Sequence, residues 1–504
     1  MNSFDTIIIG SGLGGLVAGA KLSKEGKKVL LIEQHSVTGG CATTFKRKDF
    51  IVDAGLHAID GLDEKDPKLK IFRDLHVFDN VEFIKIPEFY RFKNGKYDFV
   101  VPNNMIEAIR VLVVKFPGEK KGIIRYFKRI QSIRAETSKF LFDRRRFIFL
   151  FPIFPFIYPN LIKNAHQTIG RFLDSVIKNE DLKLILQANL LYYHDDPYTM
   201  SIIYFSAGQA SYFLGGGCYI KGGSQKLSDH FVSIIKNNGG EILTKKRVTK
   251  IITENNKAIG VEYQNTDSKT SENETAFAQN IISNASIPAV GNLLSPESRK
   301  LIQRPTDNLE RSCSLLSVYV GFKREIKELG SINYSTIIFD DTVKCLKDVI
   351  RNNKGSFENK NFVFVDYSTI HSELAPKGKS SGVFCAIDYI TDWENLTKND
   401  YWKKKDEVAQ IFFRKLENLL PGISGEIEFF EVGTSKTIEK FTLNPGGSVY
   451  GFAQTPKQTG MYRIKNKSVI ENLYFASAWA TPGGGFTGAI LSGWLCAEEI
   501  LRSK

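Results

Sequence analysis

A short apolar run followed by closely spaced glycines constrains the fold of this chain most strongly. Asp5-Thr-Ile-Ile-Ile9 is rich in β-branched residues, and Gly10-Ser-Gly-Leu-Gly-Gly15 follows it directly. Residues 16–25 then place apolar side chains at helical spacing, and Val29-Leu-Leu-Ile32 forms a second apolar run that ends at Glu33. This order of segments predicts a β-α-β unit with two buried, neighbouring strands.

The glycine spacing in this unit indicates a nucleotide-binding turn. Gly10 permits a tight turn, Gly12 lets the backbone approach a pyrophosphate, and Gly15 lets the helix pack on the strand. The helix N-terminus would bind the phosphates, and Glu33 would accept hydrogen bonds from the adenosine ribose hydroxyls. The alternative is a purely structural glycine turn. We predict dinucleotide binding, with Leu13 and Gly14 in the same turn.

A second glycine pair distinguishes the cofactor. Residues Glu33-Gln34-His35, Gly39-Gly40-Cys41 and Asp53-x-Gly55-x-His57 follow the β-α-β unit, whereas an NAD enzyme has no special need for another glycine pair here. The run resembles the phytoene desaturase family of FAD-dependent oxidoreductases, which includes carotenoid isomerases and retinol saturases, and it is most similar to the isomerase and saturase branch. The resemblance implies that Gln34, Gly39, Gly40 and Cys41 lie along FAD. Amine oxidases carry Arg where this chain has Cys41, which argues against that branch.

Two later segments resemble further parts of the same FAD site. Gly215–Gln225 and the short strand expected to end at Val248 resemble the second FAD segment, in which Val248 would offer its backbone to the adenine. The alternative is that these glycines only form turns. Residues 472–489 predict a strand and a glycine turn before an apolar helix over Ile490–Leu501. By resemblance, this last segment holds the flavin through Ala478, Gly485, Thr487 and Gly488.

The resemblance implies an α/β fold with two interleaved domains. One is a Rossmann-type FAD-binding domain of the glutathione-reductase and amine-oxidase kind, and the other is an α+β substrate domain. We expect the FAD-binding domain to comprise residues 1–80, 215–290 and 440–504, and the substrate domain to comprise 81–214 and 291–439. The sequence contains no second glycine motif in a β-α-β context, so we expect no separate NAD(P)H domain.

The excess of positive charge is concentrated in one segment. The chain has 68 Lys and Arg against 55 Asp and Glu, and much of the difference falls between Arg110 and Arg146. Ile123, Phe127, Ile130 and Ile133 recur there at helical spacing, and a proline-broken aromatic run, Phe147–Pro159, follows. We predict that residues 110–165 form an insertion that binds an anionic membrane surface. The alternative is a buried helix with a solvated basic face. The absence of a nucleic-acid module argues against a nucleic-acid partner.

The remaining composition predicts a reducing environment. The six cysteines form no C-x-x-C pair, so neither a disulfide framework nor a zinc site is indicated, and we expect no metal. The first residues predict no export signal, and no apolar run is long enough to span a bilayer. We therefore expect a cytoplasmic protein that associates peripherally with membranes.

Candidate acid–base residues are few because a flavin supplies its own redox chemistry. His57 is the first candidate for a proton donor or acceptor, with a hydrogen-bonded structural histidine as the alternative. His194-Asp195-Asp196 is a second candidate, with a helix-terminus cap as the alternative.

We predict an FAD-dependent oxidoreductase acting on CH–CH groups of a lipophilic polyene, either a carotenoid or a retinoid, by dehydrogenation or cis-trans isomerisation. The alternatives are reduction of a polyene double bond, as in retinol saturases, and a non-catalytic membrane-surface flavoprotein. The sequence does not identify the external electron acceptor or donor.

Overall fold

The first of two large sheets carries the predicted β-α-β unit. The computed structural model describes residues 3–143, 153–267 and 273–503. In this sheet the strand order is β10-β2-β1-β13-β12-β11, with β19 paired to β13. The strands are β1 (Ser3–Ile9), β2 (Val29–Ile32), β10 (Glu241–Leu243), β11 (Lys246–Glu254), β12 (Lys257–Asn265), β13 (Glu274–Ser283) and β19 (Leu473–Phe475). The strands β10, β2, β1, β13 and β19 are mutually parallel, whereas β11 and β12 form an antiparallel extension.

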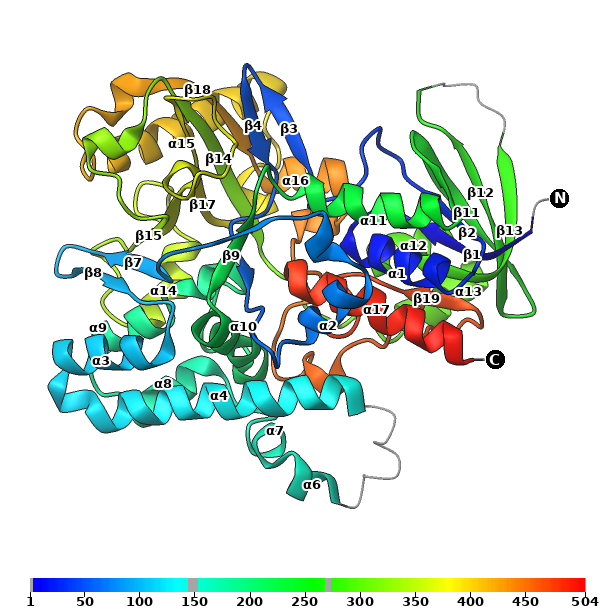
Figure 1. The fold of residues 1–504 in the computed structure, drawn as a ribbon, viewed down its shortest axis with the longest axis horizontal. Helices are drawn as coiled ribbons and strands as arrows, with labels where there is room; N and C mark the ends of the chain where they lie inside the picture. The colour runs from blue at the N-terminus through cyan, green and yellow to red at the C-terminus, as the bar shows by residue number, and fades with distance from the viewer. Residues whose placement is uncertain (1–2, 144–152, 268–272, 504) are drawn as a thin grey trace.

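Three helices from distant parts of the chain pack together beside this sheet (Figure 1). They are α1 (Leu13–Lys24), α11 (Gln225–Asn237) and α17 (Gly485–Arg502). Helix α1 contacts both of the others. All four residues of β2 are buried, which is typical of a central parallel strand covered on both faces.

The kinds of element predicted for the glycine-rich segments are confirmed, but the bounds of two of these elements differ from the prediction. The strand, helix and second strand of the β-α-β unit form as expected. Helix α17 begins at Gly485 and not at Ile490, so the expected glycine turn supplies the first turn of the helix. Val248 was expected to end a short strand, but it is the third residue of β11. The preceding short strand, β10, ends earlier, at Leu243.

The second large sheet is mainly antiparallel and has the order β18-β14-β17-β16-β15-β7-β8. Its strands are β7 (Tyr90–Lys93), β8 (Asp98–Val101), β14 (Ser314–Phe322), β15 (Ser335–Ile338), β16 (Phe362–Asp366), β17 (Ser380–Asp388) and β18 (Ile427–Gly433). Helix α15 (Lys398–Glu417) packs near β18 with Phe412 and Phe413 buried. Two small sheets complete the strands described: β3 (Thr44–Arg47) pairs with β4 (Phe50–Asp53), and β9 (Gly217–Ile220) lies between β5 (Ile59–Asp60) and β6 (Phe83–Lys85).

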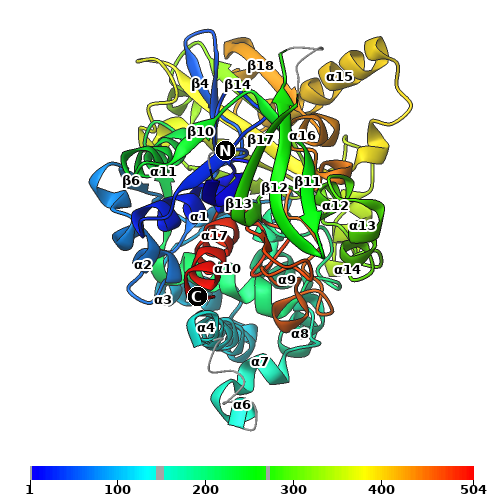
Figure 2. The same ribbon diagram turned by 90° about the vertical axis from the view of Figure 1, so that its right-hand side faces the viewer.

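A layer of helices lies below the second sheet in the view of Figure 1, and the turned view of Figure 2 shows α6 at its far end. It comprises α3 (Met105–Lys115), α4 (Lys120–Asp143), α6 (Phe154–Ile157), α7 (Pro159–Lys163), α8 (Ile169–Val176), α9 (Glu180–Leu186) and α10 (Ile202–Gly215). The other helices are α2 (Pro67–Asp74), α12 (Ile287–Asn292), α13 (Pro296–Gln303), α14 (Leu346–Asn353) and α16 (Ser435–Thr442).

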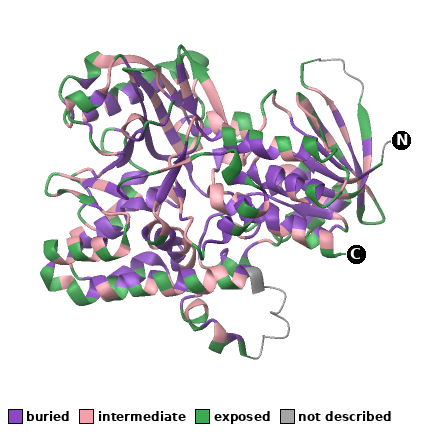
Figure 3. Ribbon diagram, viewed as in Figure 1, coloured by how far each residue is buried: buried purple, intermediate pink, exposed green. Residues whose placement is uncertain are grey.

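The apolar face of the predicted basic helix packs inside the protein. Ile123, Phe127, Ile130 and Ile133 of α4 are all buried, and α4 packs along α10. Figure 3 shows buried and exposed stretches alternating along α4. This face is therefore not available to a bilayer, which corrects that part of the membrane interpretation. In the part of the chain that the structure describes, no helix is both long and apolar enough to cross a membrane.

The aromatic run predicted to follow this helix lies partly outside the described residues, since 144–152 are not among them. The division into two domains, with the boundaries given above, stays a prediction.

Candidate functional site

One large cavity lies between the two sheets and the helices below them. Its volume is about 1940 Å³, well above the roughly 300–1,000 Å³ typical of a small-molecule pocket, so it can hold a dinucleotide and a second molecule. Most of the predicted site residues line it: Gly10, Gly12, Leu13, Glu33, Gln34, Gly39, Gly40, Cys41, His57, Val248, Ala478, Gly485, Thr487 and Gly488.

The two predicted glycine turns meet at one end of this cavity. Gly39 pairs with Gly12, and its N–H donates to the carbonyl of Ser11 at 3.0 Å. A Cβ on Gly12 would lie 2.4 Å from Asn284 Oδ1, and one on Gly40 would lie 3.1 Å from the Gly12 Cα atom. Gly12 is also the N-cap of α1 and provides no side-chain cap. The first N–H groups of α1 therefore remain available to a phosphate.

Gly14 and Gly15 do not line the cavity; they permit close packing behind it. A Cβ on Gly14 would lie 2.1 Å from the carbonyl oxygen of Ala476, and one on Gly15 would lie 2.4 Å from that of Gly10. The packing role predicted for Gly15 agrees with this geometry.

Glu33 is buried at the end of β2, and its carboxylate holds the first glycine turn. Its Oε2 accepts hydrogen bonds from Ser11 N at 2.8 Å and Ser11 Oγ at 2.6 Å, and its Oε1 accepts one from His35 N at 2.9 Å. A carboxylate offers about four acceptor positions, so one remains for a ribose hydroxyl. Sequence reasoning did not find the part that Ser11 plays here.

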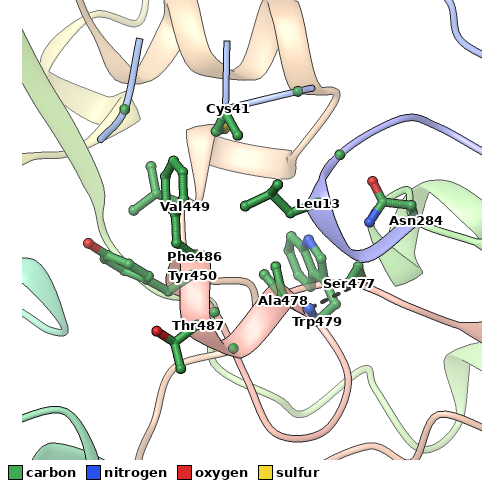
Figure 4. A pocket seen from close by; sticks show the side chains of 18 of the residues that line it. Leu13, Cys41, Asn284, Val449, Tyr450, Ser477, Ala478, Trp479, Phe486 and Thr487 are labelled. Carbon is green, nitrogen blue, oxygen red and sulfur yellow. Dashed lines mark hydrogen bonds between the residues drawn. The ribbon is translucent and has the colours of Figure 1, made fainter. Parts of the chain in front are cut away.

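The C-terminal segment lines the cavity beside the first glycine turn. Gly484, the N-cap of α17, and Gly485, its first residue, line the cavity, so the positive end of this helix faces it. No side chain caps this end, and its N–H groups remain available. Figure 4 shows Ala478, Phe486 and Thr487 from this segment around the same hollow as Leu13.

Sequence reasoning missed Arg463, which supports the wall at Ala478. Its guanidinium is buried and donates to the carbonyl oxygens of Ala478 and Phe452, each at 2.6 Å. Burial lowers its pKa to about 10. Among the described residues it makes no salt bridge, so its hydrogens fix backbone carbonyls, and no sequence pattern marks this role.

His57 lies on the cavity wall and forms a pair with a tyrosine from η4 (Ala188–Tyr192). Its Nδ1 is 2.9 Å from Tyr192 Oη. Burial lowers the pKa of His57 to about 4, so the imidazole is neutral near pH 7. A neutral imidazole can accept one hydrogen bond and donate another, which suits proton transfer.

The backbone around His57 is rigidly held. The carbonyl groups of Ala54, Leu56 and His57 each accept a hydrogen bond from a tyrosine hydroxyl, those of Tyr319, Tyr367 and Tyr334 respectively. Asp53 Oδ1 accepts from Leu56 N at 3.0 Å, and its Oδ2 accepts from Ser224 N at 2.7 Å. The segment that carries His57 is thus fixed to the second sheet and to the start of α11.

The second histidine candidate lies elsewhere. His194 does not line the cavity, and its Nε2 is 2.9 Å from Thr199 Oγ1. Burial lowers its pKa despite the neighbouring carboxylates. Asp196 holds a turn through Tyr198 N and caps no helix. The N–H of His194 donates to the carbonyl of Leu190 at 2.9 Å, so the tripeptide follows the end of η4 and lies outside the cavity.

Comparison with known proteins places these features in a family. The family model of the flavin-containing amine oxidoreductases matches residues 13–501. Prolycopene isomerase from Daucus carota is 28% identical over 99% of this chain and 80% of the carrot protein. All-trans-retinol 13,14-reductase from Danio rerio is 27% identical over 99% of this chain and 86% of the fish protein.

Solved structures share the fold at lower identity. An oxidoreductase from Methanosarcina mazei aligns with a TM-score of 0.64 and 16% identity, covering 99% of this chain and 100% of that one. Putrescine oxidase aligns with a TM-score of 0.66 and 12% identity, covering 99% of both chains. Because the family model matches nearly the whole chain, the chain belongs to the flavin-containing amine oxidoreductases and binds FAD.

Proposed function

We propose that this protein transforms the double bonds of a lipophilic polyene, either a carotenoid or a retinoid, by dehydrogenation or cis-trans isomerisation. The observation that carries the proposal is the aromatic wall of the cavity next to the flavin-binding turns. This wall includes Phe89, Tyr192, Tyr193, Tyr319, Tyr334, Tyr450 and Phe486. Flat aromatic faces suit the long planar surface of a conjugated chain.

The chain's own groups would orient the substrate and manage one proton. FAD, when bound, supplies the two-electron oxidation or reduction. His57 is the candidate to exchange a proton with the polyene, because it lines the cavity, it is neutral and its ring is oriented by Tyr192. The fixed backbone at residues 54–57 would hold this ring in place. The buried tyrosines keep their protons, since burial raises the pKa of Tyr192 and Tyr334 well above the usual value.

Reduction of a polyene double bond is the second candidate reaction. The similarity to a retinol 13,14-reductase favours it, as the similarity to a prolycopene isomerase favours isomerisation. Dehydrogenation requires an external electron acceptor and reduction an external donor, and neither is identified.

Turnover under anaerobic conditions would separate these reactions. The FAD-loaded protein is incubated with a cis-polyene in liposomes, with the flavin either oxidised or reduced by dithionite, and products are analysed by mass and absorbance. A changed spectrum at constant mass, obtained only with reduced flavin, indicates isomerisation. Loss or gain of two hydrogens indicates dehydrogenation or reduction. If the polyene stays unchanged in both states, the protein is a non-catalytic flavoprotein and the proposal is wrong.

A matched pair of variants would test the assignment of His57. We expect His57→Ala to lower turnover by about 10²-fold, which is typical for loss of a general acid or base, without loss of bound FAD. The control is Tyr192→Phe, which keeps the aromatic wall and removes only the hydroxyl that orients the ring. Its effect should be smaller, and equal turnover of His57→Ala and the wild type would remove His57 from the mechanism.

We further propose that α6 and α7 contact an anionic membrane surface. Phe156 of α6 is 84% exposed, and Ile153 and Ile162 are also exposed. The neighbouring α4 presents Lys121, Arg125 and Lys128 around a shallow groove shared with Asn160. Phe154 of α6 packs against Phe140, which lines the cavity. A polyene could therefore enter the cavity from a bilayer beside α6.

Co-sedimentation with phosphatidylglycerol vesicles would test this contact. Burial of one phenylalanine contributes about 1.5–3 kcal/mol, so Phe156→Ser should weaken binding by roughly ten- to hundredfold. The control is Trp402→Ser, an exposed aromatic residue (55%) on α15, which should bind as the wild type does. Equal sedimentation of the wild type and Phe156→Ser would contradict the proposed surface.

A further inference from the structure

A cluster of charged side chains lies in the cavity wall next to the start of α17. Its members are joined by ion pairs and comprise three carboxylates and two cations, namely Asp60, Asp63, Asp66, Lys68 and Arg134. Lys68 and Arg134 are buried, and both line the cavity together with Asp60 and Asp66, whereas Asp63 does not. The cluster thus has one more carboxylate than it has cations. Neither the glycine turns nor His57 explains why this negative charge is placed there.

The ion-pair distances show which carboxylate is least neutralised. Asp66 Oδ2 is 2.9 Å from Lys68 Nζ and 3.6 Å from Arg134 Nη2, so it is shared by both cations. Asp63 forms a closer pair with Arg134. Asp60 pairs with Lys68 at 3.5 Å, a longer distance than that between Lys68 and Asp66. The excess negative charge of the cluster therefore lies mainly on Asp60.

Asp60 also directs its carboxylate at the first turn of α17. It is the last residue of β5, and pairing with Gly217 of β9 fixes its backbone. Its Oδ2 faces Lys68, and its Oδ1 accepts a hydrogen bond from Thr487 Oγ1 near the start of α17. The side chain of Asp60 is 15% exposed, whereas that of Asp66 is 1% exposed. The cavity therefore meets the charge of Asp60 at the uncapped end of α17.

The electrostatic effect of Asp60 extends to a second contact of the same helix end. Tyr204 Oη donates to the carbonyl oxygen of Gly484, the N-cap of α17, at 2.8 Å. Burial raises the pKa of Tyr204 to about 12; Arg463 opposes this shift, and the Asp60 carboxylate adds to it. The positive end of a helix stabilises a negative charge placed beside it. Asp60 acts in the opposite sense, because a carboxylate repels such a charge.

We propose that Asp60 lowers the reduction potential of the bound FAD, so that the reduced flavin is a stronger electron donor. When FAD takes up two electrons and one proton, its ring system gains one negative charge. The N-terminus of α17 favours that charge, and the Asp60 carboxylate opposes it. The inference rests on the assignment of Gly485, Thr487 and Gly488 to the flavin, and it does not depend on the identity of the substrate.

The reduction potential of the FAD-loaded protein, measured without substrate, would test this effect. The protein is reduced slowly under anaerobic conditions at pH 7 in the presence of a reference dye, and the absorbance of flavin and dye gives the potential. Asp60→Asn removes the charge, keeps an acceptor for Thr487 and leaves two carboxylates with two cations, so the variant should fold and retain FAD. We expect it to favour the reduced flavin about tenfold more than the wild type does, which is about 30 mV for a two-electron couple. An unchanged or lower potential would overturn the proposal, and loss of FAD would show that Asp60 holds the cofactor instead.

Two matched variants would separate the charge of Asp60 from its position and from the net charge of the cluster. Asp60→Glu keeps the carboxylate, so its potential should stay close to that of the wild type. Asp63→Asn removes the same charge from the same cluster, but Asp63 does not line the cavity, so the potential should rise less than in Asp60→Asn. A rise in Asp60→Glu or in Asp63→Asn equal to that in Asp60→Asn would overturn the assignment to the Asp60 charge. Because no polyene is present, a failure of the proposed function would leave these potentials unchanged.

Discussion

At the scale of residues, Glu33 connects three backbone and side-chain donors to the cofactor end of the cavity. Because Ser11 N, Ser11 Oγ and His35 N all donate to its carboxylate, this side chain shapes the turn, and we propose that it also contacts the nucleotide. A substitution should therefore affect both the geometry of the turn and the affinity for FAD.

We expect Glu33→Ala to lose FAD during gel filtration. Loss of the carboxylate leaves the Ser11 donors without a buried acceptor and removes the expected ribose contact, each at a cost of about 1–3 kcal/mol. The ratio of flavin to protein absorbance measures the outcome. Glu25→Ala, a change at the exposed end of α1, is the control and should retain FAD. Full flavin content in Glu33→Ala would contradict the assigned contact.

Asp366 predicts a pH dependence of stability. It is buried at the end of β16, and burial raises its pKa to about 6, although Ser331 Oγ and Ser368 N donate to it. Because this value exceeds the unfolded one of about 3.9, the unfolded chain loses the proton first as the pH rises. The folded state is therefore destabilised progressively between about pH 4 and pH 6, and the penalty is constant above that range.

Asp366→Asn should remove this penalty. The free energy of unfolding at pH 7, measured with urea, should rise by up to about 2–3 kcal/mol relative to the wild type, with little difference near pH 4. Asp49→Asn, at an exposed turn, should follow the wild type at both pH values. A variant that is stabilised equally at pH 4 and pH 7 would show that the carboxyl charge is not the cause.

At the scale of elements, the first and last helices described are held together by backbone contact. A Cβ on Gly493 of α17 would lie 2.2 Å from the carbonyl oxygen of Gly14 in α1. The two helices could not approach as closely with any larger residue at this point. Since α1 and α17 each direct an uncapped N-terminus at the cavity, their spacing also sets the geometry of the cofactor site.

Gly493→Ala should push these helices apart. We expect a loss of about 1–3 kcal/mol in the free energy of unfolding, together with weaker FAD binding. Thermal unfolding and flavin content would measure the two effects. A Cβ on Gly118 would meet no atom within 4 Å, so Gly118→Ala should change neither. Wild-type stability of Gly493→Ala would mean that the backbones separate at no cost.

Prediction from the sequence succeeded where the signal is local. The β-α-β unit has its strand, turn and helix within about 30 residues, although Gly12 and Gly14 are required by Asn284 and Ala476 from much later in the chain. The start of α17 was misplaced because the glycines at 483–485 are typical of a turn, whereas packing against α1 extends the helix. The partners of His57 and Ala478 were not predictable, because Tyr192 and Arg463 reach them only through the folded chain.

At the scale of the whole molecule, FAD should act as a clamp between parts that are far apart in sequence. The cavity is lined by residues from Ile9 to Ser503 and by both large sheets. FAD should therefore raise the unfolding temperature of the apoprotein, with about 4 kcal/mol of stabilisation at a thousandfold excess over its Kd. FMN and ADP, which each resemble one half of FAD, should stabilise less, even together. Equal stabilisation by ADP alone would show that the flavin end contributes nothing.

The contact between α1 and α17 also orders events during synthesis on the ribosome. The glycine turn at Gly10–Gly15 is made early, but β1 lacks its neighbour β13 and α1 lacks α17 until much later. The apolar surfaces of β1 and α1 therefore lack their partners through most of the elongation of the nascent chain. Such exposed apolar surface favours association with chaperones. Cofactor capture would be a late event, completed only after the last helix emerges.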